Sequence, residues 1–327
     1  MAVLRAKPQK IVEFYLGLLN QSLVAPLVIT RANGEDFKGS LNDTVTLRIG
    51  GLRATARDYE FRTRTAPIQF DDIQGGEGID IKLDTHITSG TILTDEHYTL
   101  DDIDFVREVI EPQMASVAGR IEAKVVAGLR AANVADTLTF GDNVDPFLVA
   151  LEAKRLMDAH KVAPTAGRTF LVGSNVAAQF LASDRLSRYD SVGVSGTPAL
   201  RDAIIGQLAG SPVVEVSALD PNEAFYLHKT AAVVGNVAPD VPRGVVAGTR
   251  LSRDGWAARW IADYDGNYVR DRSIVSTFLG VNDVRDERQA NGDLVVDTTP
   301  GVTRRNVRLV KLDFTGTASV LTQAPVV

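Results

Sequence analysis

The candidate metal ligands in this sequence are four histidines and the acidic stretch at residues 263–267. The histidines stand at His86, His97, His160 and His228, and none of them has the spacing of zinc ligands. The stretch DYDGN at residues 263–267 resembles a calcium loop, but its glycine stands fourth instead of sixth and no glutamate stands twelfth. The sequence therefore predicts surface or half-buried histidines and no metal site.

Motifs for nucleophilic attack or phosphate binding are weak as well. The stretch GVSGTPAL at residues 193–200 lacks the GxGxxG spacing of a dinucleotide site, and it is not the GxSxG turn of hydrolases. Asp101, Asp102 and Asp104 could act as acids, yet they stand where a helix is expected to begin and complement its dipole. The chain has no cysteine, which excludes disulfides and thiolate chemistry. We expect no catalytic residue, no cofactor and no enzymatic activity.

A cluster of charged side chains lies in a stretch that is poor in large apolar residues. Its members are Arg53, Arg57, Arg62 and Arg64, interleaved with Asp58 and Glu60. Arginine can contact phosphates, but the acidic neighbours favour an exposed ribbon that forms ion pairs with neighbouring chains. The formal net charge is −6, so a basic surface that binds nucleic acid is not expected. We predict that these six residues make inter-subunit contacts.

A long helix over residues 98–129 is the most distinctive element that the sequence predicts. Thr99 followed by Asp102 resembles a capping box. Apolar residues recur every three or four positions, at Ile103, Val106, Ile110, Met114, Val117, Ile121, Val125 and Leu129. Pro112 predicts a kink or a break, with a straight helix that starts near Glu111.

The segments before this helix do not resemble a compact domain. Residues 1–43 hold a short amphipathic helix followed by breaks, which is typical of an arm. VTLRI at residues 45–49 and IDIKLDTHIT at residues 79–88 read as strands. Residues 50–78 between them read as a long excursion away from any core.

Residues 145–261 read as a compact α/β unit. Asp145 and Pro146 open a helix, TFLVG at residues 169–173 is a buried strand, and Ser174 is expected to cap a short helix. A hairpin follows in the stretch RGVVAGTRLSRDGWAARW. Residues 262–327 are mostly strand-like.

An arm, a long polar excursion and a very long helix expose surfaces that only neighbouring subunits can bury. The length of 327 residues suffices for one large domain or two smaller ones. No apolar run approaches the ~20 residues of a membrane span, so no membrane partner is expected. The sequence thus favours a structural protein that assembles.

The order of these elements resembles the major capsid proteins of tailed bacteriophages, with the Hong Kong 97-type fold, in the branch that assembles with a scaffolding protein. The stretches that carry the resemblance are NDTVTLRI (42–49), DEHYTLDDIDFVREVIEPQMASVAGRIEAKVV (95–126), TFLVGSNVAAQFLASDRL (169–186), IIGQLAGSPVVEVSAL (204–219), AFYLHKTAAVV (224–234) and FLGVNDVRDE (278–287). Asn42 replaces the glycine that usually opens the first of them.

The resemblance implies an α+β fold with a defined domain map. The map consists of an N-terminal arm (1–43), an extended E-loop (44–80), a peripheral domain with the spine helix (81–144), an axial domain (145–261), and the return strands of the peripheral domain with a C-terminal tail (262–327). The spine helix would cover residues 95–132 and bridge the peripheral and axial parts of a thin shell.

The resemblance also implies a function and partners. The chain would form pentamers and hexamers of an icosahedral shell that encloses double-stranded DNA and contacts it weakly. A scaffolding protein, a portal and a decoration protein are implied as partners. The shell would be assembled in the cytoplasm of a bacterial host and become part of the virion. Some shells of this fold carry isopeptide cross-links from an E-loop lysine, but residues 39–81 contain no lysine.

Two alternatives stay open at this point. One is the shell protein of an encapsulin-type nanocompartment, which has the same fold and encloses an enzyme instead of DNA. The other is a soluble α/β enzyme, which would be a discrete monomer with a cleft filled by a ligand.

Overall fold

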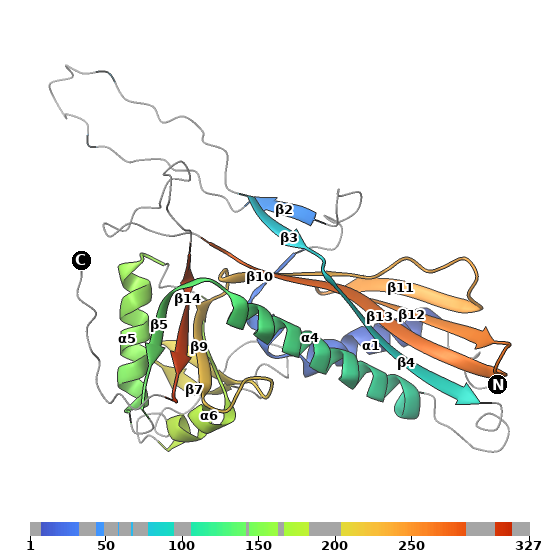
Figure 1. Cartoon of the computed structure of the whole chain (residues 1–327), viewed down its shortest axis with the longest axis horizontal. Helices are drawn as coiled ribbons and strands as arrows, with labels where there is room; N and C mark the ends of the chain where they lie inside the picture. Colours follow the sequence, from blue (N-terminus) through green and yellow to red (C-terminus); the bar gives the residue numbers. More distant parts are fainter. Residues whose placement is uncertain are drawn as a thin grey trace.

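Two six-stranded sheets divide the molecule into two lobes at opposite ends of its longest axis (Figure 1). The computed structural model describes residues 8–32, 44–48, 58, 67, 78–94, 106–141, 144–162, 167–182, 204–285 and 305–315. We call the lobe with the long strands, at the right of Figure 1, the first lobe and the other the second lobe. Helices and strands alternate irregularly along the chain, so the fold is α+β, as the sequence predicts.

Strand β13 (Arg270–Asp283) is the centre of the first lobe. The sheet consists, in spatial order, of β1 (Thr30–Ala32), β10 (Ala232–Val237), β13, β12 (Trp256–Asp265) and β11 (Ala247–Arg253). β4 (Thr85–Thr94) pairs antiparallel with β13 along residues 270–279. Asp254 and Gly255 join β11 to β12 with positive φ angles, which is the turn geometry that matches the twist of a hairpin.

Helix α4 (Glu111–Ala131) begins where the sequence predicts, with Pro112 in its first turn. Proline fits there because the first backbone N–H groups of a helix have no partner within the helix. A π-helical turn, η3 (Val106–Ile110), precedes α4. The expected cap at Thr99 lies outside the described residues.

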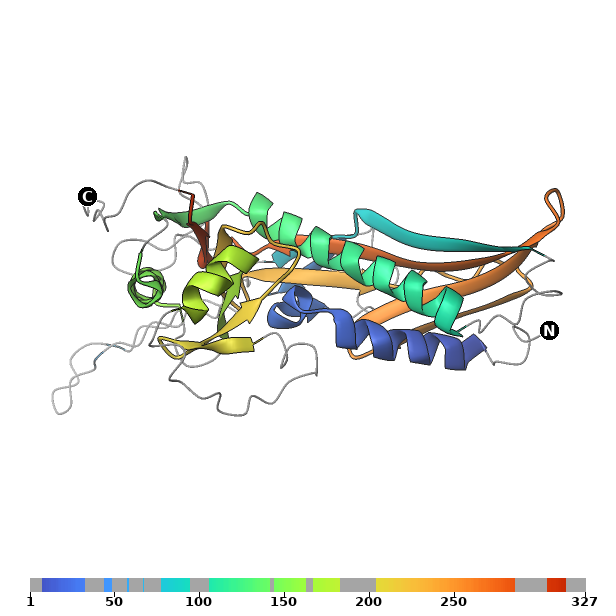
Figure 2. The same ribbon diagram turned by 90° about the horizontal axis from the view of Figure 1, so that it is seen from below.

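Helices α4 and α1 (Pro8–Ser22) lie along one face of the first sheet (Figure 2). The predicted apolar stripe is confirmed over the described residues, since its members Ile110, Met114, Val117, Ile121, Val125 and Leu129 are all buried. Gln113 Nε2 donates to Thr91 Oγ1 (2.9 Å) and to the carbonyl oxygen of Ser273 (2.8 Å). These bonds fix α4 beneath β4 and β13.

Residues 8–32, within the predicted arm of residues 1–43, pack into the core of the first lobe, and the rest of that predicted arm lies outside the described residues. Ile11, Tyr15 and Leu19 of α1 are buried in one cluster with α4 and the sheet. Each such side chain stabilises the packed position by roughly 1.5–3 kcal/mol through burial, which explains why α1 stays on the body. The helix α2 (Ala25–Val28) then leads into β1.

The second lobe is built on a mixed sheet. In spatial order its strands are β5 (Val134–Thr139), β14 (Asn306–Asp313), β9 (Glu223–His228), β6 (Arg168–Val172), β8 (Ser211–Glu215) and β7 (Ile204–Leu208). Helices α5 (Pro146–Ala159) and α6 (Ser174–Leu181) pack with it around a second apolar cluster.

The two helices of this lobe start by different means. Asp145 caps α5 as predicted, because its side chain accepts a hydrogen bond from the Phe147 N–H (2.9 Å). The prediction that Ser174 caps α6 is wrong, since the N-cap is Gly173 and no side chain caps the helix. The carbonyl of Pro221 accepts from the N–H groups of the first turn instead. The backbone approaches so closely that a Cβ at Gly173 would lie 2.1 Å from the Asp220 carbonyl oxygen.

The sheets divide the chain differently from the predicted boundaries at residues 145 and 261. Strands β10, β11 and β12, expected in the axial domain, lie in the first sheet with β13. Strand β14, expected among the return strands of the peripheral domain, lies in the second sheet between β5 and β9. The chain passes back and forth between the lobes, so no single boundary separates them.

A small antiparallel ribbon stands apart from both sheets (Figure 1). It pairs β2 (Thr44–Arg48) with β3 (Gly78–Lys82), from Thr44 opposite Lys82 to Arg48 opposite Gly78. The predicted excursion therefore begins and ends at two adjacent strand ends. The expected strand over residues 79–88 is in fact divided into β3 and β4.

Candidate assembly site

Within the described ranges, no group of three or more His, Asp or Glu side chains could hold a metal ion. In the stretch DYDGN at residues 263–267, which resembles a calcium loop, Asp263 and Asp265 both form ion pairs with Arg272. Their charges are neutralised by an arginine and are not arranged around a cation. Among the helices that the structure describes, none is long and apolar enough to cross a membrane.

Three of the four histidines lie in the described part of the chain, and each has a neighbour. The neighbours are Phe278 for His86 (4.7 Å between ring centroids), Asp136 for His160 (2.8 Å) and Thr230 for His228 (2.8 Å). Burial and the nearby Arg259 lower the pKa of His86. No shared site brings these histidines together, and His97 lies outside the described residues.

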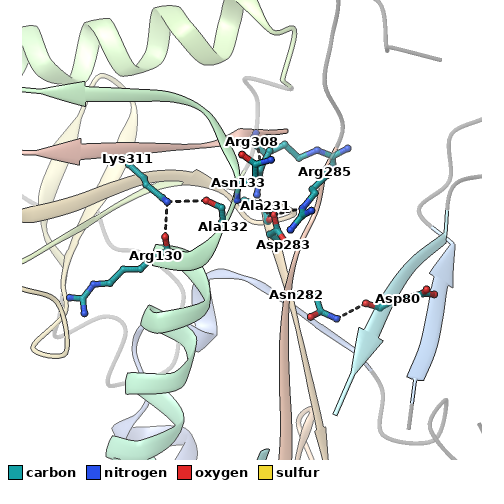
Figure 3. A network of polar contacts seen from close by, with 11 residues as sticks. Asp80, Arg130, Ala132, Asn133, Ala231, Asn282, Asp283, Arg285, Arg308 and Lys311 are labelled. Atoms are coloured by element: carbon teal, nitrogen blue, oxygen red, sulfur yellow. Dashed lines mark hydrogen bonds and ion pairs between the residues drawn. The ribbon is translucent and has the colours of Figure 1, made fainter. Parts of the chain in front are cut away.

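The three chain crossings between the lobes meet at one junction (Figure 3). The first crossing leads from α4 to β5, the second from β9 to β10, and the third from β13 to β14. Asn306 joins all three. Its Nδ2 donates to the Ala231 carbonyl (2.8 Å) and its backbone N–H donates to the Asn133 carbonyl (2.7 Å). Its Oδ1 accepts from the Arg308 N–H (3.0 Å), so this fully buried amide is satisfied on both sides.

Asp283, at the end of β13, extends the same network. Its carboxylate accepts from the Asn133 N–H (3.3 Å) and from Arg285 Nε (2.9 Å). The hydrogen bond and the charge of Asp283 raise the pKa of Arg285. The hydrogen bond from Asn133 therefore connects the first crossing to the end of β13, where the third crossing begins.

Two cations bind the end of α4 to the second lobe. Lys311 Nζ donates to the carbonyls of Arg130 (2.6 Å) and Ala132 (2.9 Å), where the negative end of the helix dipole lies (Figure 3). The Arg130 guanidinium contacts Glu223 through several short bonds and lies 3.0 Å from Asp220. The bond to Glu223 is the largest cause of the raised pKa of Arg130. The helix therefore ends in a fixed position between the lobes.

The junction also holds the ribbon of β2 and β3. The side-chain amide of Asn282, on β13, donates to the Asp80 carbonyl on β3 (Figure 3). Ile81 is fully buried in a small cluster with Ala32, Val233 and Val284. The ribbon of β2 and β3 is thus attached to the first lobe through β3.

Of the six predicted contact residues, only one lies in the part of the chain that the structure describes. Asp58 is described and is exposed. Arg53, Arg57, Glu60, Arg62 and Arg64 lie outside the described residues. Their contacts with neighbouring chains remain a prediction.

The sequence reasoning missed the junction residues Asn306, Asp283 and Lys311. Each of them is an ordinary polar residue in a strand, and its partner stands far away along the chain. The one local signal is Asn306 itself, an amide at the start of the alternating stretch NVRLVKLD. A buried amide is a costly choice unless it is fully hydrogen-bonded.

Exposed apolar side chains gather at the end of the first lobe that lies farthest from the junction. Tyr264, Tyr268 and Val269 belong to the turn between β12 and β13 or border it. Ile92 of β4 is exposed as well, but it pairs with Arg272 whereas Tyr264 pairs with Asp271, so the Ile92 and Tyr264 side chains lie on opposite faces of the sheet. All four are more than two-fifths exposed. The Arg270 guanidinium lies 4.5 Å from the centre of the Tyr268 ring. Apolar groups that are rimmed by charge are typical of a surface that binds another protein.

Solved structures with a similar fold are those of bacteriophage heads and capsids. The capsid of Ralstonia phage GP4 matches with a TM-score of 0.56 at 10% identity, over 89% of this chain and 88% of that chain. The head structure of Helicobacter pylori bacteriophage KHP40 matches with a TM-score of 0.55 at 11% identity, over 89% and 90%. The structure from Mycobacterium phage Che8 matches with a TM-score of 0.53 at 17% identity, again over 89% and 90%.

No protein-family model and no curated protein sequence matches the chain. The similarity therefore lies in the three-dimensional structure, over nearly nine-tenths of the residues, at identities of 10–17%. The phage capsid fold predicted from the sequence is confirmed.

Proposed function

We propose that this chain is the major capsid protein of a tailed bacteriophage and assembles into the icosahedral shell that encloses double-stranded DNA. The observation that carries the proposal is the fold, which matches phage capsids over both lobes. The similar structures are shells made of repeated subunits, which supports self-association of this chain. We infer that the chain acts as a structural protein rather than an enzyme, because the structures that it resembles are those of capsids.

The proposal gives each structural feature a task. The junction keeps the two lobes in one fixed relation, so the subunit can serve as a flat building unit. The excursion that leaves the ribbon of β2 and β3 reaches neighbouring subunits, where Arg53, Arg57, Arg62 and Arg64 form ion pairs with carboxylates, and Asp58 and Glu60 pair with cations. A scaffolding protein, a portal and a decoration protein are the further partners, and assembly takes place in the cytoplasm of a bacterial host.

Electron microscopy and sedimentation of the purified protein, coexpressed with its scaffolding protein, test the proposal. We expect hollow shells of uniform diameter that sediment as large particles. A small monodisperse species under the same conditions would contradict it. Nuclease-protected double-stranded DNA in particles from infected cells distinguishes a virion from an encapsulin-type compartment, which would carry a protein cargo instead.

A further inference from the structure

Helix α4, which the structure describes along its whole length, buries two polar side chains on opposite flanks of its apolar stripe. They are Gln113, which is 2% exposed, and Glu122, which is 8% exposed. The two positions are about two and a half turns apart, so their side chains point to opposite sides of the helix. Glu122 contacts the backbone N–H groups of Val24 and Ala25, whereas Gln113 contacts the sheet. A buried amide needs an explanation, because an apolar residue would cost less free energy to bury at that position.

The amide of Gln113 connects α4 to three strands of the first sheet. Its Nε2 donates to Thr91 Oγ1 on β4 and to the Ser273 carbonyl oxygen on β13. Its Oε1 accepts from Ser273 Oγ (3.2 Å), and Ser273 Oγ accepts in turn from Trp260 Nε1 on β12 (3.0 Å). Thr91 and Ser273 lie directly opposite each other in the ladder between β4 and β13. The network therefore fixes one point of the helix against three adjacent strands.

Only one placement of α4 on the sheet satisfies this network. A slip by one residue would move the helix by about 1.5 Å along its axis and turn it by about 100°, which is far outside the geometry of these hydrogen bonds. A slip by a full turn would bring Val109 or Val117 to the place of Gln113, and neither side chain can form hydrogen bonds. Apolar contacts distinguish these placements less sharply, because they are non-directional and the stripe repeats every three or four residues.

The end of α4 that carries Gln113 lies far from the contacts that fix its other end. Lys311 and Arg130 hold the C-terminal end at the junction. Gln113 is about 27 Å away from Ala131 along the helix axis. A small change of direction at the junction would therefore displace the far end of the helix unless a second directional contact held it.

We propose that Gln113 is a positioning residue, which holds the N-terminal half of α4 in one placement on the sheet. Its contribution to stability is small, because methionine at this position would fill a similar volume with apolar atoms. Ser273 Oγ would keep its bond from Trp260, and Thr91 is half-buried and accessible to water. Few polar groups would thus lose their partners. Buried polar groups can specify one arrangement of a helix without adding stability, as an asparagine does in a coiled coil.

Fluorine NMR of the unassembled subunit, with 5-fluorotryptophan incorporated, tests the proposal. Trp260 belongs to the network, and Trp256→Phe makes it the single tryptophan of the chain. Trp256 Nε1 has no hydrogen-bond partner among the described residues, so this background should fold normally. We expect one resonance for the parent protein and for the control Met114→Leu, which exchanges one apolar residue for another. Gln113→Met should give two or more resonances, or a line at least twofold broader, at an unchanged midpoint of urea unfolding.

The number of resonances decides the role of Gln113. A single sharp resonance for Gln113→Met would overturn the proposal whatever its urea midpoint, because Gln113 would then contribute at most stability. If Gln113→Met does not fold, Thr91→Val removes the β4 partner alone. Several resonances for Thr91→Val would then support the proposal, and a single sharp one would overturn it.

The consequence for assembly rests on the proposed function, because a shell needs many copies of one shape. Coexpressed with the scaffolding protein, Gln113→Met should form particles of mixed diameter, with at least a tenfold loss of particles of the wild-type size in electron micrographs. Met114→Leu should assemble normally. Shells of normal size and yield from Gln113→Met would refute this consequence. A wild-type protein without shells would refute the proposed function, and the fluorine spectra would still decide the role of Gln113.

Discussion

Glu122 is a buried charge that attaches the N-terminal segment to α4. Its side chain is 8% exposed, and its two oxygens accept hydrogen bonds from the backbone N–H groups of Val24 (3.2 Å) and Ala25 (3.0 Å). Burial raises the pKa of Glu122, and the two hydrogen bonds oppose this shift only in part. The carboxylate therefore satisfies two backbone donors, although its own desolvation costs free energy.

Replacing Glu122 with alanine should destabilise the protein by about 2–4 kcal/mol, because two N–H groups lose their acceptor and one of them, at Ala25, is buried. Glu122→Gln should cost less than half as much, since its carbonyl oxygen still accepts one bond. Urea unfolding of the three proteins checks the order. Equal stability of the wild type and Glu122→Ala would contradict the role assigned to the carboxylate.

The same residue predicts a pH dependence. The folded protein holds the Glu122 proton more tightly than the unfolded chain does, because the folded-state pKa is raised. The wild type should therefore gain stability relative to Glu122→Gln as the pH falls from 7 towards 5. The difference between the two unfolding free energies isolates this group, since all other titrating residues are shared. A difference that stays constant across this range would count against a raised pKa.

At the level of elements, helix α4 is the part whose failure should stop folding. Val117 and Ile121 are almost fully buried on its apolar stripe. Val117→Asp or Ile121→Asp places an unpaired charge there, at a cost of several kcal/mol, so little soluble folded protein is expected. Arg57→Ala should leave the subunit folded and impair assembly.

Thermal melts and sedimentation of these variants separate the two outcomes. Arg57→Lys serves as the control for Arg57→Ala, because it keeps the charge and loses the planar fork that pairs with carboxylates. Identical melting and identical assembly of all the variants would remove the distinction between a folding element and a contact element.

The elements that the sequence predicts best are those with a local cause. The stripe of α4, the proline in its first turn and the cap of α5 by Asp145 depend on residues within a few positions of one another. The docking of α1, the place of β14 and the start of α6 depend on distant partners. Pro221 replaces the expected cap of α6, and β14 lies between strands that precede it by many residues. The junction escaped prediction for the same reason, because Asn306 and Lys311 acquire partners only when three crossings meet.

At the level of the whole molecule, the proposed shell should be held together without covalent cross-links. An isopeptide bond needs an amine on the excursion, but residues 39–81 contain no lysine, and Lys38 and Lys82 stand only at the ends. The guanidinium groups of the arginines there stay protonated and are poor nucleophiles. The absence of cysteine excludes disulfides as well.

Mature particles boiled in denaturing detergent should therefore run as a single band near 35.2 kDa. Particles treated with a chemical cross-linker before boiling provide the positive control for larger bands. A ladder of dimers, pentamers and hexamers in untreated particles would contradict this expectation and would point to Lys38 or Lys82 as the reactive group.

Because the chain crosses between the lobes three times among its described elements, the second sheet cannot be completed until late in synthesis. A ribosome completes β5 at residue 139, but β14, the strand that separates β5 from β9, begins only at residue 306. At 5–20 residues per second, the gap lasts on the order of 10–30 s. During that time the second sheet lacks β14, the strand that joins β5 to β9. The unpaired edges of β5 and β9 are then accessible to a chaperone. A chain that ends before residue 306 would never form β14, so β5 and β9 would stay unpaired with each other's sheet edge. We expect such a chain to be degraded by proteases and not to assemble.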